Sequence, residues 1–314
     1  MDKFNPVDMS VWQGRQDPED GELALRWHDK VQPWPQAGRA APGVALVGFA
    51  CDEGVRRNKG RVGAAGAPLA VRKLLANTAW HLGRPVYDSG DLCCDDGDLD
   101  TAHGSLAERV ARLLDEGHFP LVLGGGHEVA FGSWSGLNLH LAGRGRIGII
   151  NFDAHFDLRM KLEQASSGTP FFQIAEQCAA QGTPFTYACL GVAETANTRA
   201  LFARAEALGV WHVLDEAMTP AELPVLLSGL DAFIARCDHL YLTIDLDVLP
   251  AAVMPGVSAP AARGVELAVI EPLIAHIRAS GKLRLADLAE YNPSLDQDNR
   301  SARVAARLVH QLTK

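Results

Sequence analysis

The sequence has no long hydrophobic run and no block of basic residues. None of its apolar stretches approaches the roughly 18 residues needed to cross a bilayer, and the start, Met1-Asp2-Lys3-Phe4, lacks the apolar core of a signal peptide. The formal net charge of −9 gives no electrostatic attraction to phosphate backbones or anionic membranes. We therefore expect a cytoplasmic protein that binds neither nucleic acid nor membranes.

The sequence also lacks a cysteine framework. Its six cysteines follow no C-x-x-C spacing, and the compartment argues against disulfides, so most are expected to be reduced, buried thiols. They are Cys51, Cys93, Cys94, Cys178, Cys189 and Cys237.

No linker, internal repeat or low-complexity tract divides the 314 residues. With 47% hydrophobic residues the chain can bury one large α/β core or two smaller ones. We expect a single catalytic domain over 1–314, whose residues 1–40 form an irregular arm, rich in Trp and Pro, with a short helix around Glu19–Val31.

Apolar runs that resemble buried strands alternate with segments of helical periodicity. The predicted strands are Val44–Ala50, Phe119–Gly124, Arg146–Phe152, Thr186–Gly191, Val210–Val213, His239–Asp245 and Leu283–Ala289. The predicted helices are Ser105–Asp115, Ala196–Ala207, Pro220–Arg236, Val265–Ser280 and Arg300–Gln311. Strands that are apolar throughout are typical of sheets covered on both faces. This alternation predicts an α/β fold, a three-layer α/β/α sandwich with a mostly parallel central sheet.

Three acidic segments follow three of these strands: Gly124-Gly125-Gly126-His127-Glu128, Asp153-Ala154-His155-Phe156-Asp157 and Asp245-Leu246-Asp247. Alternate residues of an extended chain point to the same side, and ligands of such sheets bind beyond the carboxyl ends of the strands. Clustered carboxylates repel each other unless a cation holds them. We therefore predict a metal site. Its ligands are His127, Asp153, His155, Asp157, Asp245 and Asp247.

A ligand set dominated by carboxylates suits manganese better than zinc, although iron, nickel and cobalt stay possible. Two ions roughly 3.5–4 Å apart would lower the pKa of a shared water toward neutrality, so that no Ser or Cys nucleophile is needed. The site thus predicts a two-metal hydrolase. The alternatives are a hydrogen-bonded acidic cluster without metal and a metal site that only stabilises the fold.

These motifs, followed by Glu290-Tyr291-Asn292-Pro293, resemble the arginase/agmatinase ureohydrolase family over about residues 44–312. The resemblance implies an oligomeric enzyme that hydrolyses a C–N bond of a guanidinium or amidine with two Mn²⁺ per subunit. One ion would be held by His127, Asp153, Asp157 and Asp245, and the other by His155, Asp153, Asp245 and Asp247. Asp153 and Asp245 would bridge the two ions.

Within this family, Ser10–Arg15, Ala24–His28, Asp52–Asn58 and Ser166–Phe171 most resemble the members that convert N-formimidoyl-L-glutamate to glutamate and formamide. That substrate carries two carboxylates, which planar guanidinium groups bind well. The candidate cations are Arg56, Arg57, Arg61 and Arg159, and Asn58 and Ser167 are further candidates for substrate binding. Arg159 is the strongest candidate because it lies two residues after Asp157. The first three arginines could instead form a solvated basic loop.

Two acidic residues have expected catalytic roles. Glu290 resembles the family glutamate that accepts hydrogen bonds from the guanidinium. Arginases place a histidine where this chain has Ser167, so we assign proton delivery to Asp157, with Ser167 orienting water or substrate. The alternatives are a guanidino hydrolase such as an agmatinase or guanidinobutyrase, and a metal-binding protein of the family without turnover.

Overall fold

The computed structural model describes residues 3–35 and 40–314. Its strands are β1 Phe4–Asn5, β2 Gln32–Pro33, β3 Val44–Ala50, β4 Val86–Cys93, β5 Phe119–Leu123, β6 Ile147–Phe152, β7 Tyr187–Val192, β8 Trp211–Leu214, β9 His239–Asp245 and β10 Leu283–Ala289. Its helices are α1 Trp27–Lys30, α2 Glu53–Arg57, α3 Ala67–Ala76, α4 Leu99–Asp115, α5 Val129–Leu141, α6 Pro170–Gln181, α7 Arg199–Ala207, α8 Leu223–Ala235, α9 Leu267–Ala279 and α10 Arg300–Thr313.

The strands form one sheet in the order β1-β4-β3-β5-β10-β9-β6-β7-β8, with β2 also paired to β4. Among the described pairs, only β1 runs antiparallel to its neighbour. The four central strands β5, β10, β9 and β6 are adjacent although their positions in the chain are far apart. Because they are parallel, their carboxyl ends lie at one edge of the sheet, where the functional loops begin.

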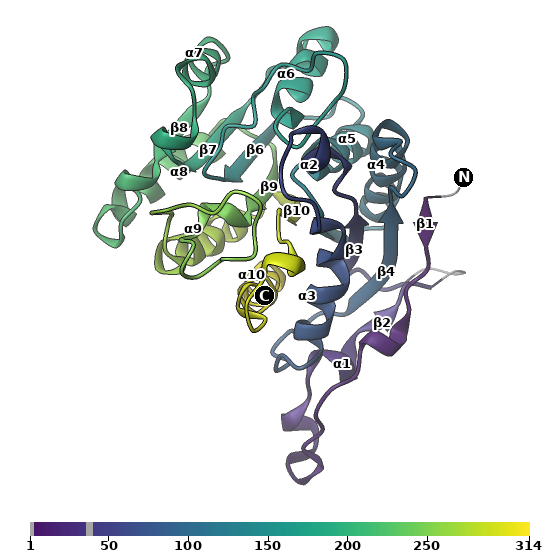
Figure 1. The fold of residues 1–314 in the computed structure, drawn as a ribbon. Coiled ribbons are helices and arrows are strands. Elements are labelled where there is room, and N and C mark those ends of the chain that lie inside the picture. The colour runs from purple at the N-terminus through teal and green to yellow at the C-terminus, as the bar shows by residue number, and fades with distance from the viewer. Residues whose placement is uncertain (1–2, 36–39) are drawn as a thin grey trace.

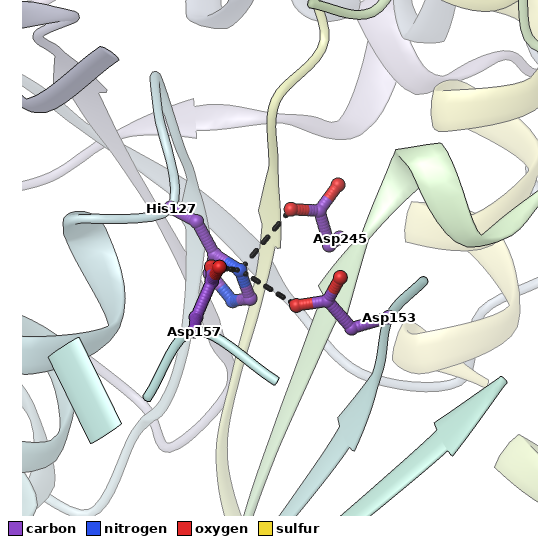
Figure 2. A group of neighbouring side chains, drawn as sticks. All are labelled: His127, Asp153, Asp157 and Asp245. Carbon is purple, nitrogen blue, oxygen red and sulfur yellow. Dashed lines mark ion pairs between the residues drawn. The ribbon is translucent and has the colours of Figure 1, made fainter. Parts of the chain in front are cut away.

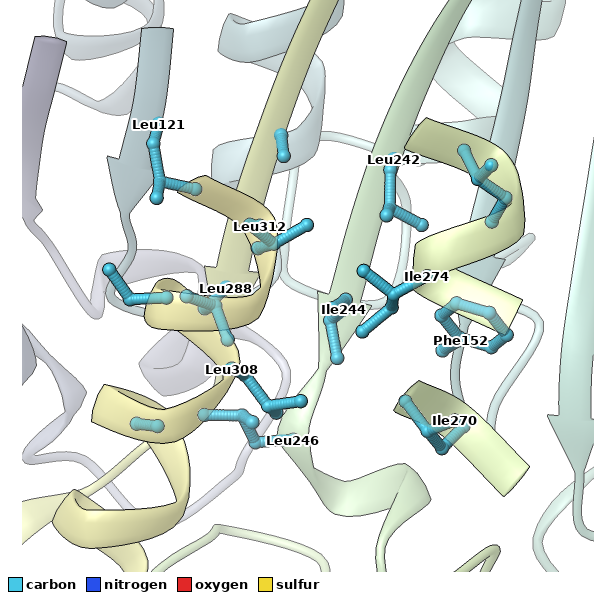
Figure 3. Packing of buried hydrophobic residues seen from close by; sticks show 14 of the residues in the cluster. Leu121, Phe152, Leu242, Ile244, Leu246, Ile270, Ile274, Leu288, Leu308 and Leu312 are labelled. Carbon is cyan, nitrogen blue, oxygen red and sulfur yellow. The ribbon is translucent and has the colours of Figure 1, made fainter. Parts of the chain in front are cut away.

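Helices cover both faces of the sheet, which confirms the predicted three-layer architecture (Figure 1). One apolar cluster joins the sheet to α3, α8, α9 and α10, and a second joins it to α4, α5, α6 and α7. In the first cluster, Leu242 and Ile244 of β9 lie beside Ile274 of α9, and Leu288 of β10 lies near Leu312 of α10 (Figure 3). All five side chains are almost completely buried, so this packing anchors the strands that carry the site.

Strand β4 was not predicted, because its sequence includes Asp88, Ser89 and Asp91. Burial of Asp88 is compensated by a bidentate ion pair, in which Arg72 donates to its two carboxylate oxygens at 2.7 and 2.9 Å. Trp12 also donates to Asp88 at 2.8 Å. A polar strand interior is tolerated here because its carboxylate is fully hydrogen-bonded.

Helices α2, α3, α5 and α6 were also not predicted, and other predicted boundaries shift by a few residues. Helix α4 begins at Leu99, six residues before its predicted start at Ser105, because the side chain of Asp98 caps it by accepting from the Thr101 N–H. Helix α5 contains Ser133, Gly132 and Gly136, which obscure its helical pattern.

The N-terminal arm is attached to the rest of the fold. Strands β1 and β2 pair with β4, and Trp27 is completely buried. The helix predicted around Glu19–Val31 is shorter in the structure, where a 3₁₀ segment at Pro18–Ala24 precedes α1. Residues 1–2 and 36–39 of the predicted arm lie outside the described residues.

The six cysteines are free thiols, as predicted, and four of them are buried. No helix in the described ranges is both long and apolar enough to cross a bilayer.

Candidate metal centre

The three acidic segments meet at the carboxyl edge of the central strands. His127 follows β5, Asp153 directly follows β6, and Asp245 ends β9. In the sheet, β5 and β9 flank β10, and β6 lies next to β9, so the loops after these strands converge in space. The six predicted ligands are therefore brought together by the parallel topology.

The first group of ligands is arranged around the ring of His127 (Figure 2). Its Nδ1 lies 2.9 Å from Asp157 Oδ2 and 3.1 Å from an oxygen of both Asp153 and Asp245. His127, Asp153 and Asp245 are almost fully buried, and Asp157 is partly buried. Four donor atoms of these residues lie within 4.8 Å of one another, a separation that a single cation can bridge.

A second group contains Asp153, His155 and Asp247. His155 Nδ1 lies 3.1 Å from Asp247 Oδ2 and 3.6 Å from Asp153 Oδ1. Asp153 belongs to both groups, as expected of a bridging ligand. Asp245 was also predicted to bridge, but among the described residues it belongs to the first group, and its Oδ1 accepts a hydrogen bond from the Asp247 N–H at 2.9 Å.

The pKa values show how strongly the site favours positive charge. Burial lowers the pKa of His127, but hydrogen bonds to Asp153, Asp157 and Asp245 raise it well above the usual value. The carboxylate of Asp247 raises the pKa of His155 in the same way. Burial, Asp247 and Asp153 raise the pKa of Asp245. Raised pKa values of His127, His155 and Asp245 mean that the metal-free site favours bound protons. A metal ion would supply the same positive charge to the carboxylates.

The donor set fits hard or borderline divalent ions. Four carboxylates and two imidazoles supply oxygen and nitrogen ligands in the proportion that suits manganese. Asp247 Oδ1 is buried and makes no hydrogen bond in the described part of the chain. A buried carboxylate oxygen without a hydrogen-bond partner lowers stability unless a cation binds it.

Two residues of the site have strained backbones. Asp157 has φ +47° and Glu290 has φ +66°, a region that residues other than glycine rarely adopt. The loop of Asp157 is held by Asn197, which accepts from the Phe156 N–H at 3.1 Å and donates to Ala154 O at 2.9 Å. Such strain persists at functional sites because the surrounding hydrogen bonds determine the conformation.

Asn151 and Asn197 were not identified from the sequence. Asn151 lies at the end of β6 and donates to Asp153 Oδ2 at 2.9 Å, and Asn197 lies in a loop 40 or more residues after the ligands that it supports. The position of Asn151, on the same face as Asp153 by strand alternation, was the available signal. Nothing in the sequence marks Asn197.

The glycines before His127 allow the loop to pass close to other backbone. A side chain on Gly125 would collide with the carbonyl of Cys51, and one on Gly126 would collide with Glu128 and Val55. We expect Gly125→Ala to move His127 and to lower the free energy of unfolding by about 1–3 kcal/mol, because backbone must shift to admit a methyl group. Urea denaturation of the metal-free protein measures this loss. Gly143→Ala is a comparison in a loop where no atom lies within 4 Å of the added carbon, although its φ of +81° adds strain.

A cavity of about 330 Å³ opens above the ligands. Of the predicted residues, its lining includes His155, Asp157, Asp245, Asp247, Asn58, Arg61, Arg159, Ser167 and Glu290. Asn58 and Ser167 are joined by a 3.2 Å hydrogen bond. Lys59 and Asn197, which were not predicted, also line the cavity. Lys59 has φ +64°.

The predicted arginines have different surroundings. Arg57 is not part of the cavity lining; it donates to Glu53 at 2.7 Å and to Gly97 O at 2.8 Å. Arg61 lines the cavity, but its guanidinium donates to the carbonyls of Val257 and Ser258. Arg159 makes no ion pair in the described residues and is exposed at the cavity.

Glu290 lies beside the first ligand group. Its Oε1 accepts from the His127 N–H at 2.8 Å, and its own N–H donates to Gly125 O at 2.8 Å. Burial and the nearby Glu128 raise the pKa of Glu290 to about 8. A cationic group that entered the cavity would therefore bind here and favour the carboxylate form.

Comparisons with known proteins give a consistent result. Residues 42–314 match the Arginase family. Over 314 residues, covering all of both chains, the sequence is 96% identical to formimidoylglutamase of Aeromonas hydrophila subsp. hydrophila. The fold is similar to that of formimidoylglutamase from Bacillus subtilis, with a TM-score of 0.83, 22% identity and coverage of 96% and 93% of the two chains. It is also similar to a variant of Trypanosoma cruzi formiminoglutamase solved with Mn²⁺, with a TM-score of 0.78, 26% identity and coverage of 88% and 94%.

Proposed function

Because the chain belongs to the arginase family, we propose that it hydrolyses the C–N bond of N-formimidoyl-L-glutamate to give L-glutamate and formamide. The observation that carries this proposal is a cluster of six metal-ligating side chains beside a cavity that also presents unpaired cations. Its relative at 96% identity is named for the same activity. The two carboxylates of this substrate match the cations that line the cavity, Lys59, Arg61 and Arg159, whereas agmatine, a dication, would be repelled by them.

We further propose that two Mn²⁺ bind, one at His127, Asp153, Asp157 and Asp245 and the other at Asp153, His155 and Asp247. When bound, the ions supply a nucleophilic water at neutral pH. The support is the donor set and the Mn²⁺ in the Trypanosoma cruzi structure.

Two carboxyl groups are placed to handle protons and the amidine. Asp157 lines the cavity, and we assign to it the transfer of a proton to the leaving amine. Glu290 is placed to accept hydrogen bonds from the amidine nitrogens. Ser167, hydrogen-bonded to Asn58, would orient the substrate or a water.

The substrate carboxylates require cations. Arg159 is available because no carboxylate pairs with it in the described residues, and Lys59 lines the same cavity. Arg61 would contribute only the part of its guanidinium that Val257 and Ser258 do not occupy. Because Arg57 is engaged outside the cavity, we assign it to holding the loop and not to the substrate.

We expect Arg159→Ala to raise KM for N-formimidoyl-L-glutamate about 10- to 100-fold, because a hydrogen bond to a charged group is worth about 1.5–3 kcal/mol. The Mn²⁺ content should stay at two. Steady-state kinetics and metal analysis measure both quantities. Met160→Ala, a change at the exposed neighbouring residue, is the matched control. An unchanged KM would remove Arg159 from substrate binding.

The activity itself is tested with Mn²⁺-reconstituted protein offered N-formimidoyl-L-glutamate, arginine, agmatine and guanidinobutyrate in parallel. Glutamate and formamide from the first compound alone are expected. Urea from a guanidino compound would keep the metal chemistry and overturn the substrate. No turnover with two ions bound would indicate a metal-binding protein without catalysis.

Three further features belong to this proposal. The chain acts as a single catalytic domain over 1–314, it assembles into a homo-oligomer, and it works in the cytoplasm without binding nucleic acid. The single sheet that includes all described strands supports the first of these.

A further inference from the structure

Behind the metal centre, the ring of His127 contacts a second polar group. Its Nδ1 faces the carboxylates of the first ligand group, whereas its Nε2 lies 3.0 Å from the hydroxyl oxygen of Thr243 on β9. Thr243 is completely buried. Nδ1 thus faces three carboxylates, whereas Nε2 has the hydroxyl of Thr243 as its partner, and that partner determines which nitrogen carries the proton when the ring is neutral.

Thr243 lies beside a buried carboxylate. Asp287 of β10 is its register partner in the parallel pair, and both residues are completely inaccessible to solvent. Tyr241, two residues before Thr243 on the same face of β9, donates to Asp287 Oδ2 at 2.6 Å. Burial raises the pKa of Asp287, while the hydroxyls of Thr243, Tyr241 and Ser133 oppose this effect.

Asp287 has no cation to explain its burial. No Lys, Arg or His in the described ranges forms an ion pair with it. Burying a carboxyl group among hydroxyls is expensive for stability alone, since an apolar residue would fill the same space without desolvation cost. Asp287 lies opposite Thr243 on the neighbouring strand, and the Thr243 hydroxyl contacts His127, so this position indicates a role in orienting His127.

The order of the hydrogen bonds follows from what each group can donate. A carboxylate only accepts, whereas a threonine hydroxyl has one proton to donate and lone pairs to accept. When the Thr243 proton turns to Asp287, its oxygen accepts from Nε2–H of His127. The lone pair of the imidazole is then on Nδ1, the nitrogen that faces the other ligands.

We propose that Thr243 and Asp287 are positioning residues that hold His127 in the tautomer and orientation required to bind metal. This inference rests on the metal centre of the proposed function. Asp287, Thr243 and His127 follow one another, and His127 belongs only to the first ligand group. Changes at Thr243 or Asp287 should therefore weaken the binding of the first ion selectively. Partners of this kind typically change metal affinity about 10- to 100-fold.

The test is Mn²⁺ titration of the unmodified protein and of Thr243→Val, Thr243→Ser and Asp287→Asn, with free Mn²⁺ measured by electron paramagnetic resonance. Thr243→Val keeps the shape and removes the hydroxyl, so one of the two ions should bind about 10- to 100-fold more weakly while the other is unchanged. Thr243→Ser should restore the affinity, and Asp287→Asn should weaken the same ion.

The matched control is Thr313→Val, which removes another completely buried hydroxyl, hydrogen-bonded to Val309 O in α10. It should bind both ions normally. Unchanged binding by Thr243→Val would overturn the positioning role and leave the metal centre intact. Equal weakening of both ions, or no rescue by Thr243→Ser, would also overturn it. Failure of the unmodified protein to bind two ions would overturn the metal centre and this inference with it.

Discussion

Replacing Asp153 by asparagine is expected to abolish the binding of both ions and to lower kcat/KM by more than the roughly 100-fold that loss of an outer hydrogen-bond partner can cost. Asp153 is the residue common to both ligand groups: one oxygen faces His127 and the other faces His155. Its change therefore affects both ions at once. Metal analysis after gel filtration and steady-state kinetics with N-formimidoyl-L-glutamate measure the outcome.

Comparison with Asp247→Ala distinguishes the loss of one ion from the loss of both. Asp247 belongs only to the second group, so this variant should lose one ion and its turnover while the first ion stays bound. Asp115→Asn, a change of an exposed carboxylate at the end of α4, should alter neither quantity. Full activity of Asp247→Ala with a single ion would contradict the two-metal mechanism, and two tightly bound ions in Asp153→Asn would contradict the shared ligand.

Removing the metal is expected to lower the melting temperature of the protein by on the order of 10 °C when both ions had been present at about 100 times their dissociation constants. Binding at that excess contributes about 2.7 kcal/mol per site, and proteins of this size shift by a few degrees per kcal/mol. The physical cause is the cluster of buried carboxylates, which repel each other without a cation. Calorimetry before and after chelation measures the shift.

The size of this shift should depend on pH. The pKa values of His127 and His155 are raised in the folded, metal-free protein, so their contribution to stability is fully present below about pH 6.5 and is lost as pH rises through the raised values. Mn²⁺ replaces these protons, and its stabilising effect should therefore grow as pH rises from 6 toward 9. Asp153→Asn should show little Mn²⁺-dependent shift at either pH, and an equal shift in both proteins would contradict a metal effect at this site.

The predicted ligands lie together in the structure because each of them is within a few residues of the end of an apolar strand. In a parallel sheet, residues just past the carboxyl ends of neighbouring strands must approach each other. Local spacing therefore predicts a non-local cluster. Strand β4 could not be predicted in this way. Its Asp88 is typical of a loop, and only the tertiary structure places Arg72 beside it and so allows the carboxylate to be buried in a strand.

The sequence did not indicate which of the predicted cations line the cavity. Arg57 and Lys59 are separated by one residue, yet Arg57 pairs with Glu53 outside the cavity and Lys59 lines it. The reason is the short helix α2, which ends at Arg57, and the positive φ of Lys59 two residues later. Side-chain direction in such a turn depends on contacts across the fold, including those of Arg61 with Val257 and Ser258.

By itself, the sequence predicted the parallel α/β fold, the six candidate ligands and the preference for a hard divalent ion. These depend on periodicity and on residue type, both of which are local properties. The tertiary structure alone decided which cations line the cavity and that Asn197 hydrogen-bonds to the loop of Asp157. It also decided that Thr243 contacts His127 and that Asp287 lies beside Thr243. The contacts of Asn197, Thr243 and Asp287 join segments that are 41 to 116 residues apart, and only strand order and packing bring them together.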